Sequence, residues 1–312
     1  MKKFLAMSLC ASLALLEAQA KPSMRVKICK AVEHAALNSS AAGVADFLKQ
    51  KGAEQGISYD VSVDTCQGNM ALASQIMEKV AGEKVDVVVT IGTLPSQCAY
   101  RLAKKGKLKA VVFVSVTNPD DVARALPHAN VTGVSNFVPL EPQIELFKKI
   151  QPGIKTLGVL YNPGEPNSVA IVERLRPVCE KMGVVLKLQA IPRASDIPQA
   201  TERLAKEADA LFISNDNLAL SAIPNIVALC SKRKVPVYVS DTDQVAHGCL
   251  ASLGPNQYEI GRQAGKMVAQ IAEGKSPNTI PVEYAETREL HVNTKGPIGI
   301  PESVRAEAHK VL

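Results

Sequence analysis

Hydroxyl, amide and carboxylate side chains gather in this chain at the points where short apolar runs end. The candidates for contact with a ligand are His34, Asn38, Thr93, Ser96, Thr117, Asn118, Tyr161, Glu165, Asn167, Ser168, Asn215, Asp216, Asn217 and Asp241. The first half of the chain offers hydroxyls and helix N-termini, and the second half offers carboxylates and amides. This division predicts a zwitterionic ligand. Its carboxylate would be held by backbone N–H groups and hydroxyls, and its ammonium by Asp216 or Asp241.

The same residue types have a second, purely structural use. Ser, Thr, Asn and Asp are the preferred N-cap residues of helices, so capping explains any single candidate as well as ligand contact does. Asp196 is predicted to be a cap and nothing more.

Sequence signatures of catalysis are absent. The chain has no GxSxG, HExxH, Walker or GxGxxG pattern. None of its five histidines has a Cys or Ser with a carboxylate close by in the sequence, and His247 with Cys249 is too isolated to predict a metal site. Catalytic triads are formed in space and not in sequence, so this absence alone decides little. It favours a protein that binds without catalysing, with no cofactor and no metal.

The candidate residues follow strands that alternate with helices. Val- and Ile-rich runs predict strands at 25–29, 59–63, 85–90, 110–116, 156–161, 184–190, 208–214, 235–240 and 249–252. Amphipathic stretches predict helices at 39–51, 70–81, 95–105, 168–182 and 195–206, with Gly52, Gly106 and Gly183 as C-caps. This alternation predicts an α/β fold with parallel sheets covered by helices on both faces. In such sheets, ligands bind beyond the carboxyl ends of the strands.

The two halves of the chain are similar to each other. Residues 85–90 resemble 208–213, and 112–115 resemble 237–240 at a nearly equal offset. Two α/β units in tandem explain this, with the divide near the Pro-Leu-Glu-Pro stretch at 139–142. The alternative is that all buried strands resemble one another.

Composition and charge exclude several classes of protein. The chain is 46% hydrophobic and 21% charged, which excludes a disordered, collagen-like or coiled-coil chain. The net charge of +6 is scattered, so nucleic acid is not a predicted partner. The densest basic run, 232–234, is predicted to follow the end of a helix.

The first twenty residues predict a cleavable signal peptide. Lys2 and Lys3 precede an uncharged apolar run at 4–16, and Ala-Gln-Ala follows at 18–20. A membrane anchor is the alternative, but a spanning helix needs roughly twenty apolar residues. Lipid attachment at Cys10 is a less favoured alternative, because Leu9 stands where a small residue is wanted. The mature protein is therefore expected in the periplasm. Its six remaining cysteines allow fifteen disulfide connectivities, which stay open.

Five stretches resemble one family, the bacterial ABC-transporter substrate-binding proteins of the tryptophan/tyrosine type. They are VEHAAL at 32–37, NVTGVS at 130–135, GVLYNPGEPNS at 158–168, SNDN at 214–217 and YEIGRQAG at 258–265. The first stretch departs from the family's E-H-P-A-L-D, because Ala35 replaces the usual Pro and Asn38 the usual Asp.

The resemblance implies a type I periplasmic-binding fold, in which two Rossmann-like lobes with parallel sheets are joined by three crossover strands. On this basis the first lobe comprises 21–139 plus 254–282, and the second comprises 140–253 plus 283–312. The implied function is a solute receptor that closes on an amino acid and delivers it to an ABC permease. We expect the protein to be a monomer. A sensory ligand-binding protein is an alternative, disfavoured because no transmembrane helix or signalling domain follows Leu312. An exported α/β enzyme is a further alternative.

Overall fold

The computed structural model describes residues 22–120 and 130–312. The predicted signal peptide, 1–20, and Cys10 within it lie outside the described residues. All of the candidate ligand-contact residues lie inside them.

The first sheet has six parallel strands in the order β11-β5-β4-β3-β1-β2. Its strands are β1 (Ser23–Lys30), β2 (Ser58–Thr65), β3 (Val87–Ile91), β4 (Val111–Val114), β5 (Val131–Ser135) and β11 (Glu283–Tyr284). Every residue of β3 and β4 is buried. Val87 and Val89 face one apolar cluster and Val88 faces another, so helices cover both faces of this sheet.

The second sheet has seven strands in the order β13-β12-β10-β9-β8-β6-β7. Its strands are β6 (Thr156–Tyr161), β7 (Val185–Ala190), β8 (Ala210–Ile213), β9 (Val237–Val239), β10 (Ala251–Pro255), β12 (Arg288–Val292) and β13 (Lys310–Val311). All of its pairs are parallel except β10 with β12. The predicted α/β class with parallel sheets is confirmed, and each of the nine predicted strands is present. Strands β5, β11, β12 and β13 were not predicted, because they are short or rich in Gly, Thr and charged residues.

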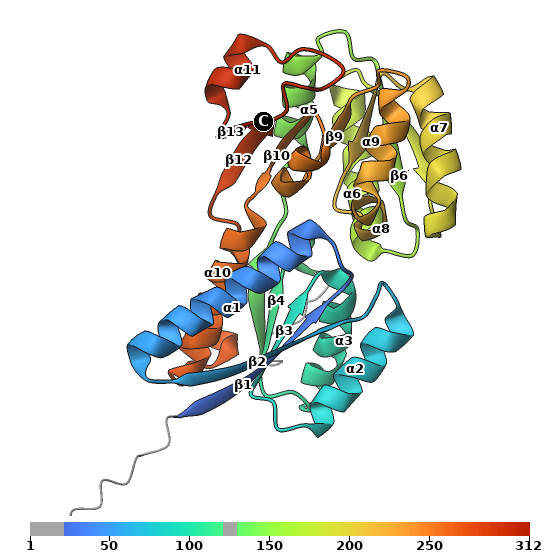
Figure 1. Cartoon of the computed structure of the whole chain (residues 1–312). Helices are drawn as coiled ribbons and strands as arrows, with labels where there is room; N and C mark the ends of the chain where they lie inside the picture. The colour runs from blue at the N-terminus through green and yellow to red at the C-terminus, as the bar shows by residue number, and fades with distance from the viewer. Residues whose placement is uncertain (1–21, 121–129) are drawn as a thin grey trace, which may run out of the picture.

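The helices divide between the two sheets. With the first sheet lie α1 (Ala35–Gln55), α2 (Met70–Gly82), α3 (Thr93–Lys104), α10 (Gln257–Ala272) and the short η3 (Pro277–Thr279). With the second lie α5 (Leu140–Ile150), α6 (Pro166–Lys181), η1 (Ala194–Asp196), α7 (Ile197–Glu207), α8 (Asn217–Ser221), α9 (Ile223–Ser231), η2 (Thr242–His247) and α11 (Glu302–Glu307). We call these two assemblies the first and the second lobe; Figure 1 shows them one above the other.

The chain passes from one lobe to the other three times. The crossings lie between β5 and α5, between β10 and α10, and between β11 and β12. β11 pairs with β5 in the first sheet, two residues beyond the boundary that the sequence places at 282. The chain after Pro255 thus returns to the first lobe, where α10 lies alongside α1 (Figure 1).

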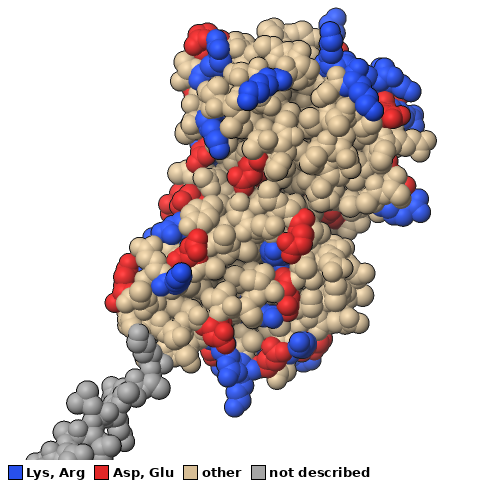
Figure 2. Space-filling view, in the orientation of Figure 1, with Lys and Arg blue, Asp and Glu red and all other residues tan. Residues whose placement is uncertain are grey.

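Helix ends agree with the sequence in part. Gly106 and Gly183 follow α3 and α6 with positive φ, as C-cap glycines do. Gly52 does not end α1, because the helix continues to Gln55 and its left-handed cap is Gly56. Asp196 is the N-cap of α7, and the basic run at 232–234 directly follows α9. On the face shown in Figure 2, side chains of both charge signs occur over both lobes.

The contact between α1 and α10 depends on glycine. A Cβ on Gly43 would lie 2.1 Å from the Tyr258 carbonyl oxygen, and one on Gly261 would lie 2.1 Å from the Ser40 carbonyl oxygen. The two backbones therefore touch at these residues. This contact fixes the start of α10, which carries a residue of the inter-lobe cavity described below.

We expect Gly43→Ala to destabilise the protein, because its methyl group would force α1 away from α10. Overpacking of this kind costs about 1–3 kcal/mol or more. The matched control is Gly82→Ala at the end of α2, where an added Cβ meets nothing within 4 Å. The control should be neutral or stabilising by up to about 1 kcal/mol. Urea denaturation of the three proteins checks this, and equal stability of the two variants would contradict it.

Candidate functional site

A cavity lies between the two lobes, at the carboxyl ends of their strands. Its lining residues follow strands of both sheets, and they are His34, Leu37, Gly92, Thr93, Ser115, Thr117, Asn136, Asn167, Asn215, Asn217, Leu220, Asp241 and Gln257. The free space is about 10 Å³, which accommodates about one water molecule. In this arrangement the lobes are closed on each other, so a larger molecule enters only when they separate.

The start of α3 gives the first-lobe wall backbone donors. Gly92 precedes the helix with φ +91, and no side chain caps the first N–H groups. A Cβ on Gly92 would lie 2.9 Å from the Ala31 Cβ, so the turn favours glycine by both space and backbone conformation. Thr93, only 1% exposed, adds a hydroxyl beside these groups. A helix start of this kind favours a negatively charged group.

His34 joins the first lobe to the second. Its Nδ1 accepts from the Leu37 N–H at 3.5 Å, and its Nε2 lies 3.2 Å from Asn217 Oδ1 across the cavity. Burial lowers the pKa of His34 to about 4, against the hydrogen bond to Asn217, which raises it. The imidazole is therefore neutral near pH 7, with its proton on Nε2 donated to Asn217.

Asp241 places a carboxyl group in the second-lobe wall. It is 3% exposed and accepts one side-chain hydrogen bond, from Gln257 Nε2 at 2.8 Å. Burial raises its pKa to about 7; the Gln257 bond opposes this and nearby Asp243 adds to it. Among the residues that the structure describes, no Lys or Arg lines the cavity, and Asp241 is the sole carboxylate that does. The site therefore has an acidic group without a cationic partner.

Gln257 connects this carboxyl group to the first lobe. Its Oε1 accepts from Ser115 Oγ at 2.7 Å and from Ser40 Oγ at 3.2 Å, while its Nε2 donates to Asp241. It is the first residue of α10, directly after the second crossing. The amide thus bridges the lobes at the cavity.

Asp216 has a different position from the one expected. It is fully buried and does not line the cavity. Its carboxylate accepts from Ser168 Oγ at 2.6 Å, from the Asn162 N–H at 2.5 Å and from the Ala219 N–H at 2.8 Å. Burial and then the charge of Glu165 raise its pKa to about 6. Asp216 is the N-cap of α8, and its acceptor capacity is used within the protein.

Glu165 caps the same helix from another element. Its carboxylate accepts from the backbone N–H groups of Asn217 and Leu218, both at 3.0 Å, and from three asparagine side chains. The first three N–H groups of α8 are therefore satisfied by Glu165 and Asp216. This helix start is not available to a ligand.

Seven of the fourteen predicted residues line the cavity, namely His34, Thr93, Thr117, Asn167, Asn215, Asn217 and Asp241. Besides Asp216 and Glu165, five others lie outside the lining. Asn38 is exposed and accepts from Lys30 Nζ at 2.6 Å, Ser96 bonds to Thr90 and the Gly92 carbonyl, and Ser168 bonds to Asp216. Tyr161 packs against the core of the second lobe, and Asn118 is not among the residues that line the cavity.

Six lining residues were not predicted, namely Leu37, Gly92, Ser115, Asn136, Leu220 and Gln257. Ser115 and Asn136 follow β4 and β5, so the strand-end rule extends to both. Ser115 also has φ +54, unusual for a residue other than glycine. Gln257 begins a helix after a crossing, a position that local sequence does not mark as a site.

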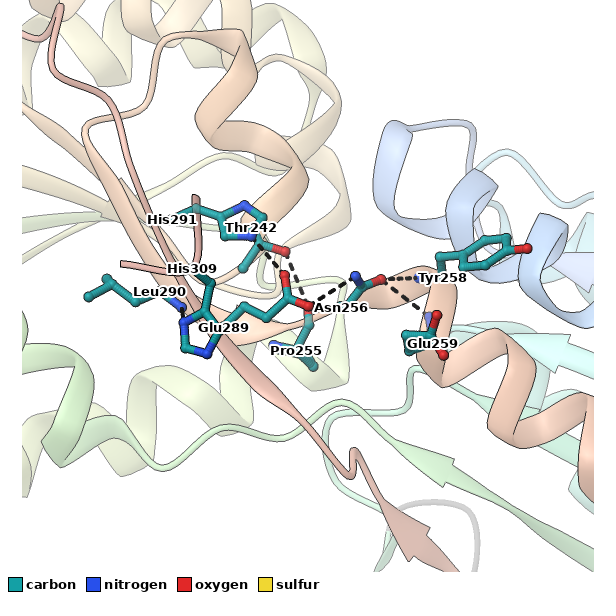
Figure 3. Close-up of polar contacts among 9 residues, drawn as sticks. All are labelled: Thr242, Pro255, Asn256, Tyr258, Glu259, Glu289, Leu290, His291 and His309. Atoms are coloured by element: carbon teal, nitrogen blue, oxygen red, sulfur yellow. Dashed lines mark hydrogen bonds and ion pairs between the residues drawn. The ribbon is translucent and has the colours of Figure 1, made fainter. Parts of the chain in front are cut away.

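A hydrogen bond connects the second crossing, between β10 and α10, to β12, which follows the third crossing. Asn256 caps α10 by accepting from Tyr258 and Glu259, and its Nδ2 donates to Glu289 Oε1 at 3.2 Å (Figure 3). Glu289 also lies 2.7 Å from His291 Nε2. Burial alone would raise the pKa of Glu289, but Asn256 and His291 outweigh it and hold the pKa below its usual range.

The described residues limit what else the site can hold. Within 22–120 and 130–312, no group of three or more His, Cys, Asp and Glu side chains is placed to hold a metal ion. No described helix combines the length and apolar character that crossing a membrane needs. All six described cysteines are buried and free.

Comparison with known proteins shows a match over nearly the whole described chain. Residues 25–312 match the family described as ABC transporter substrate binding protein. The chain is 28% identical over 277 residues to the "Tyrosine-binding protein" of Clostridioides difficile, which covers 88% of this chain and 79% of that protein.

Two solved structures of similar proteins superpose on this chain to different degrees. The ABC domain from Streptococcus pneumoniae in complex with L-Trp is 29% identical with TM-score 0.84, covering 93% of this chain and 100% of that one. A ligand-free, open structure of a substrate-binding protein from Clostridium difficile is 27% identical with TM-score 0.67, covering 93% and 99%. The two structures have nearly equal sequence identity and coverage, so their different TM-scores reflect the arrangement of the lobes. The lobes of this chain are arranged more like those of the L-Trp complex than like those of the open form. The fold is that of type I periplasmic-binding proteins.

Asp241→Asn should stabilise the ligand-free protein at pH 8. A carboxyl whose folded pKa is raised contributes stability that is present below its unfolded pKa and lost as pH rises through the folded value near 7. The variant should therefore equal wild type near pH 4 and exceed it at pH 8 by at most about 4 kcal/mol. The contribution of His34, with its lowered pKa, runs in the opposite direction but is common to both proteins.

Asp216→Asn is the comparison variant and should destabilise at every pH above about 6. It places an amide N–H₂ against N–H and O–H donors, which costs about 1–3 kcal/mol. Urea denaturation between pH 4 and pH 8 distinguishes the two. An Asp241→Asn effect that is independent of pH would contradict the assignment of a buried, unpaired carboxyl.

Proposed function

Because the chain belongs to the ABC transporter substrate-binding protein family, we propose that it binds an amino acid in the cavity between its lobes. That it binds a small molecule and is not an enzyme follows from the family itself, which confirms the sequence-based expectation. The zwitterionic amino acid, the closing mechanism and the delivery to an ABC permease are proposed.

The observation that carries the proposal is the uncompensated carboxyl group of Asp241. A buried carboxylate is costly unless it is paired, and no described Lys or Arg in the lining pairs with it. A ligand ammonium would supply the missing charge. The opposite wall offers the free N–H groups of α3 and the Thr93 hydroxyl, which suit a carboxylate. One ligand with both groups satisfies both walls.

The relatives support an amino acid as the class of ligand. One is named a tyrosine-binding protein, and another structure holds L-Trp. In this chain the apolar lining residues Leu37 and Leu220 offer contact for a ligand side chain. We propose an amino acid, with an aromatic one as the first candidate.

The closed arrangement supports binding by movement of the lobes. His34 with Asn217, and Asn215 with Thr117 at 3.1 Å, form hydrogen bonds from lobe to lobe beside the cavity. We propose that a ligand enters the open form and that these contacts form on closure, with the three crossings as hinges. Export to the periplasm by the signal peptide, a permease partner and a monomeric state complete the proposal.

Asp241→Asn should weaken binding of L-tryptophan and L-tyrosine by at least about 2 kcal/mol. This is the loss expected when one partner of a buried charge pair is removed. Titration calorimetry measures it, with the exposed Asp60→Asn in β2 as the control of equal charge change. Unchanged affinity in Asp241→Asn would remove the chemical basis for an amino acid, and a neutral or anionic solute would become the better proposal.

A further inference from the structure

Three asparagines of the second-lobe wall, Asn167, Asn215 and Asn217, use their amide N–H₂ groups inside the protein. Asn167 Nδ2 donates to the Asn215 carbonyl at 2.6 Å and to Glu165 Oε2 at 3.1 Å. Asn217 Nδ2 donates to Glu165 Oε2 at 2.6 Å, and Asn215 Nδ2 donates to Thr117 Oγ1 and to Asn136 Oδ1. The capacity that these amides have left is that of their oxygens, which only accept.

Glu165 fixes this orientation for two of the three. Five N–H donors converge on its two oxygens, from the side chains of Asn162, Asn167 and Asn217 and from the backbone of Asn217 and Leu218. A carboxylate has no N–H or O–H to donate, so an amide oxygen turned toward it would be repelled. Asn167 and Asn217 must therefore point N–H₂ at Glu165.

We propose that Glu165 is a positioning residue that sets the polarity of the second-lobe wall, and thereby selects ligands that carry an ammonium group there. It does not line the cavity itself. By holding the N–H₂ groups of Asn167 and Asn217, it leaves neutral acceptor oxygens to the cavity that Asp241 also lines, and the Asn217 oxygen, which already accepts from His34 Nε2, keeps one lone pair. This inference rests on the proposed amino-acid function and names the residue that gives it specificity.

A wall of this composition discriminates by hydrogen-bond type. An ammonium group has three N–H donors, and Asp241 can receive only part of them. Amide oxygens receive the remainder without adding a second buried charge, which would be costly to desolvate. A ligand without the ammonium would leave the Asn167 oxygen unpaired and the Asn217 oxygen with His34 as its one donor, so the site should reject it.

The test substitutes Glu165→Gln and compares each amino acid with its des-amino analogue. The pairs are L-tryptophan with indolepropionate and L-tyrosine with hydroxyphenylpropionate, measured by titration calorimetry. Glutamine offers one oxygen and one N–H₂. With its oxygen kept on the Leu218 N–H, its N–H₂ takes the place of Oε2, and Asn167 or Asn217 then has to turn its oxygen toward the new donor. The N–H₂ group of that cavity asparagine then faces the ligand. We expect the ratio of the two affinities to fall about tenfold or more, as for one lost hydrogen bond to a charged group.

The control is Glu173→Gln, an exposed residue of the same helix with the same charge change. It should leave both affinities unchanged. A purely structural role for Glu165 would weaken both members of a pair equally and keep their ratio, which would overturn the inference. If Glu165→Gln does not fold, Asn167→Leu removes one amide from the wall with Glu165 intact. The same fall in ratio is then expected, and an unchanged ratio would overturn the inference.

The same data separate the inference from the proposed function. A wild-type protein that binds the des-amino analogues as tightly as the amino acids contradicts the proposed function, and the inference falls with it. A wild type that prefers the amino acids, together with a Glu165→Gln protein of equal preference, contradicts the inference alone.

Discussion

A carboxyl group buried between two lobes without a cation is the constraint to which the rest of the site responds. Desolvation raises the pKa of Asp241 to about 7, so near neutral pH the group lies close to its own midpoint. Gln257 gives it one hydrogen bond and no charge. A positive partner would offset the cost of burying this carboxyl group, and in the proposed function that partner is the ammonium group of the ligand. Because the other lining residues are amides, hydroxyls, apolar side chains and a neutral His34, Asp241 is the one carboxyl group among the described residues that line the cavity.

The scaffold brings this group to the cavity through the path of the chain. Asp241 follows β9 in the second lobe, and its hydrogen-bond partner Gln257 begins α10 in the first. The close contact of α10 with α1 through Gly43 and Gly261 fixes that partner. The link Asn256–Glu289 joins the second crossing to the third (Figure 3). The packing of two helices therefore bears on the site, although neither glycine lies in it.

Sequence patterns predicted the architecture well and the site in part, for a physical reason. Apolar runs such as 110–116 and 156–161 are buried strands whatever their partners, so periodicity finds them. Strand ends lie at the cavity, so the rule that ligands bind there placed Thr93, Asn215 and Asp241 correctly in space. The rule does not predict whether the side chain at a strand end points into the cavity or into the protein. Asp216 and Asp241 follow neighbouring strands, yet the first is held by three protein donors and the second by one. Gln257 depends on a crossing that only the tertiary fold reveals.

Counting protons on binding tests the central claim most directly. Titration calorimetry of wild type with L-tryptophan or L-tyrosine, in buffers of different ionisation enthalpy, gives the protons released per ligand bound. If the ammonium is held by Asp241, whose pKa is about 7 in the closed arrangement without ligand, binding should release about half a proton at pH 7, more at pH 6 and almost none at pH 8, where the ligand's ammonium is still protonated. Asp241→Asn should release none. Binding without proton release between pH 6 and pH 7, or with proton uptake, would contradict the account.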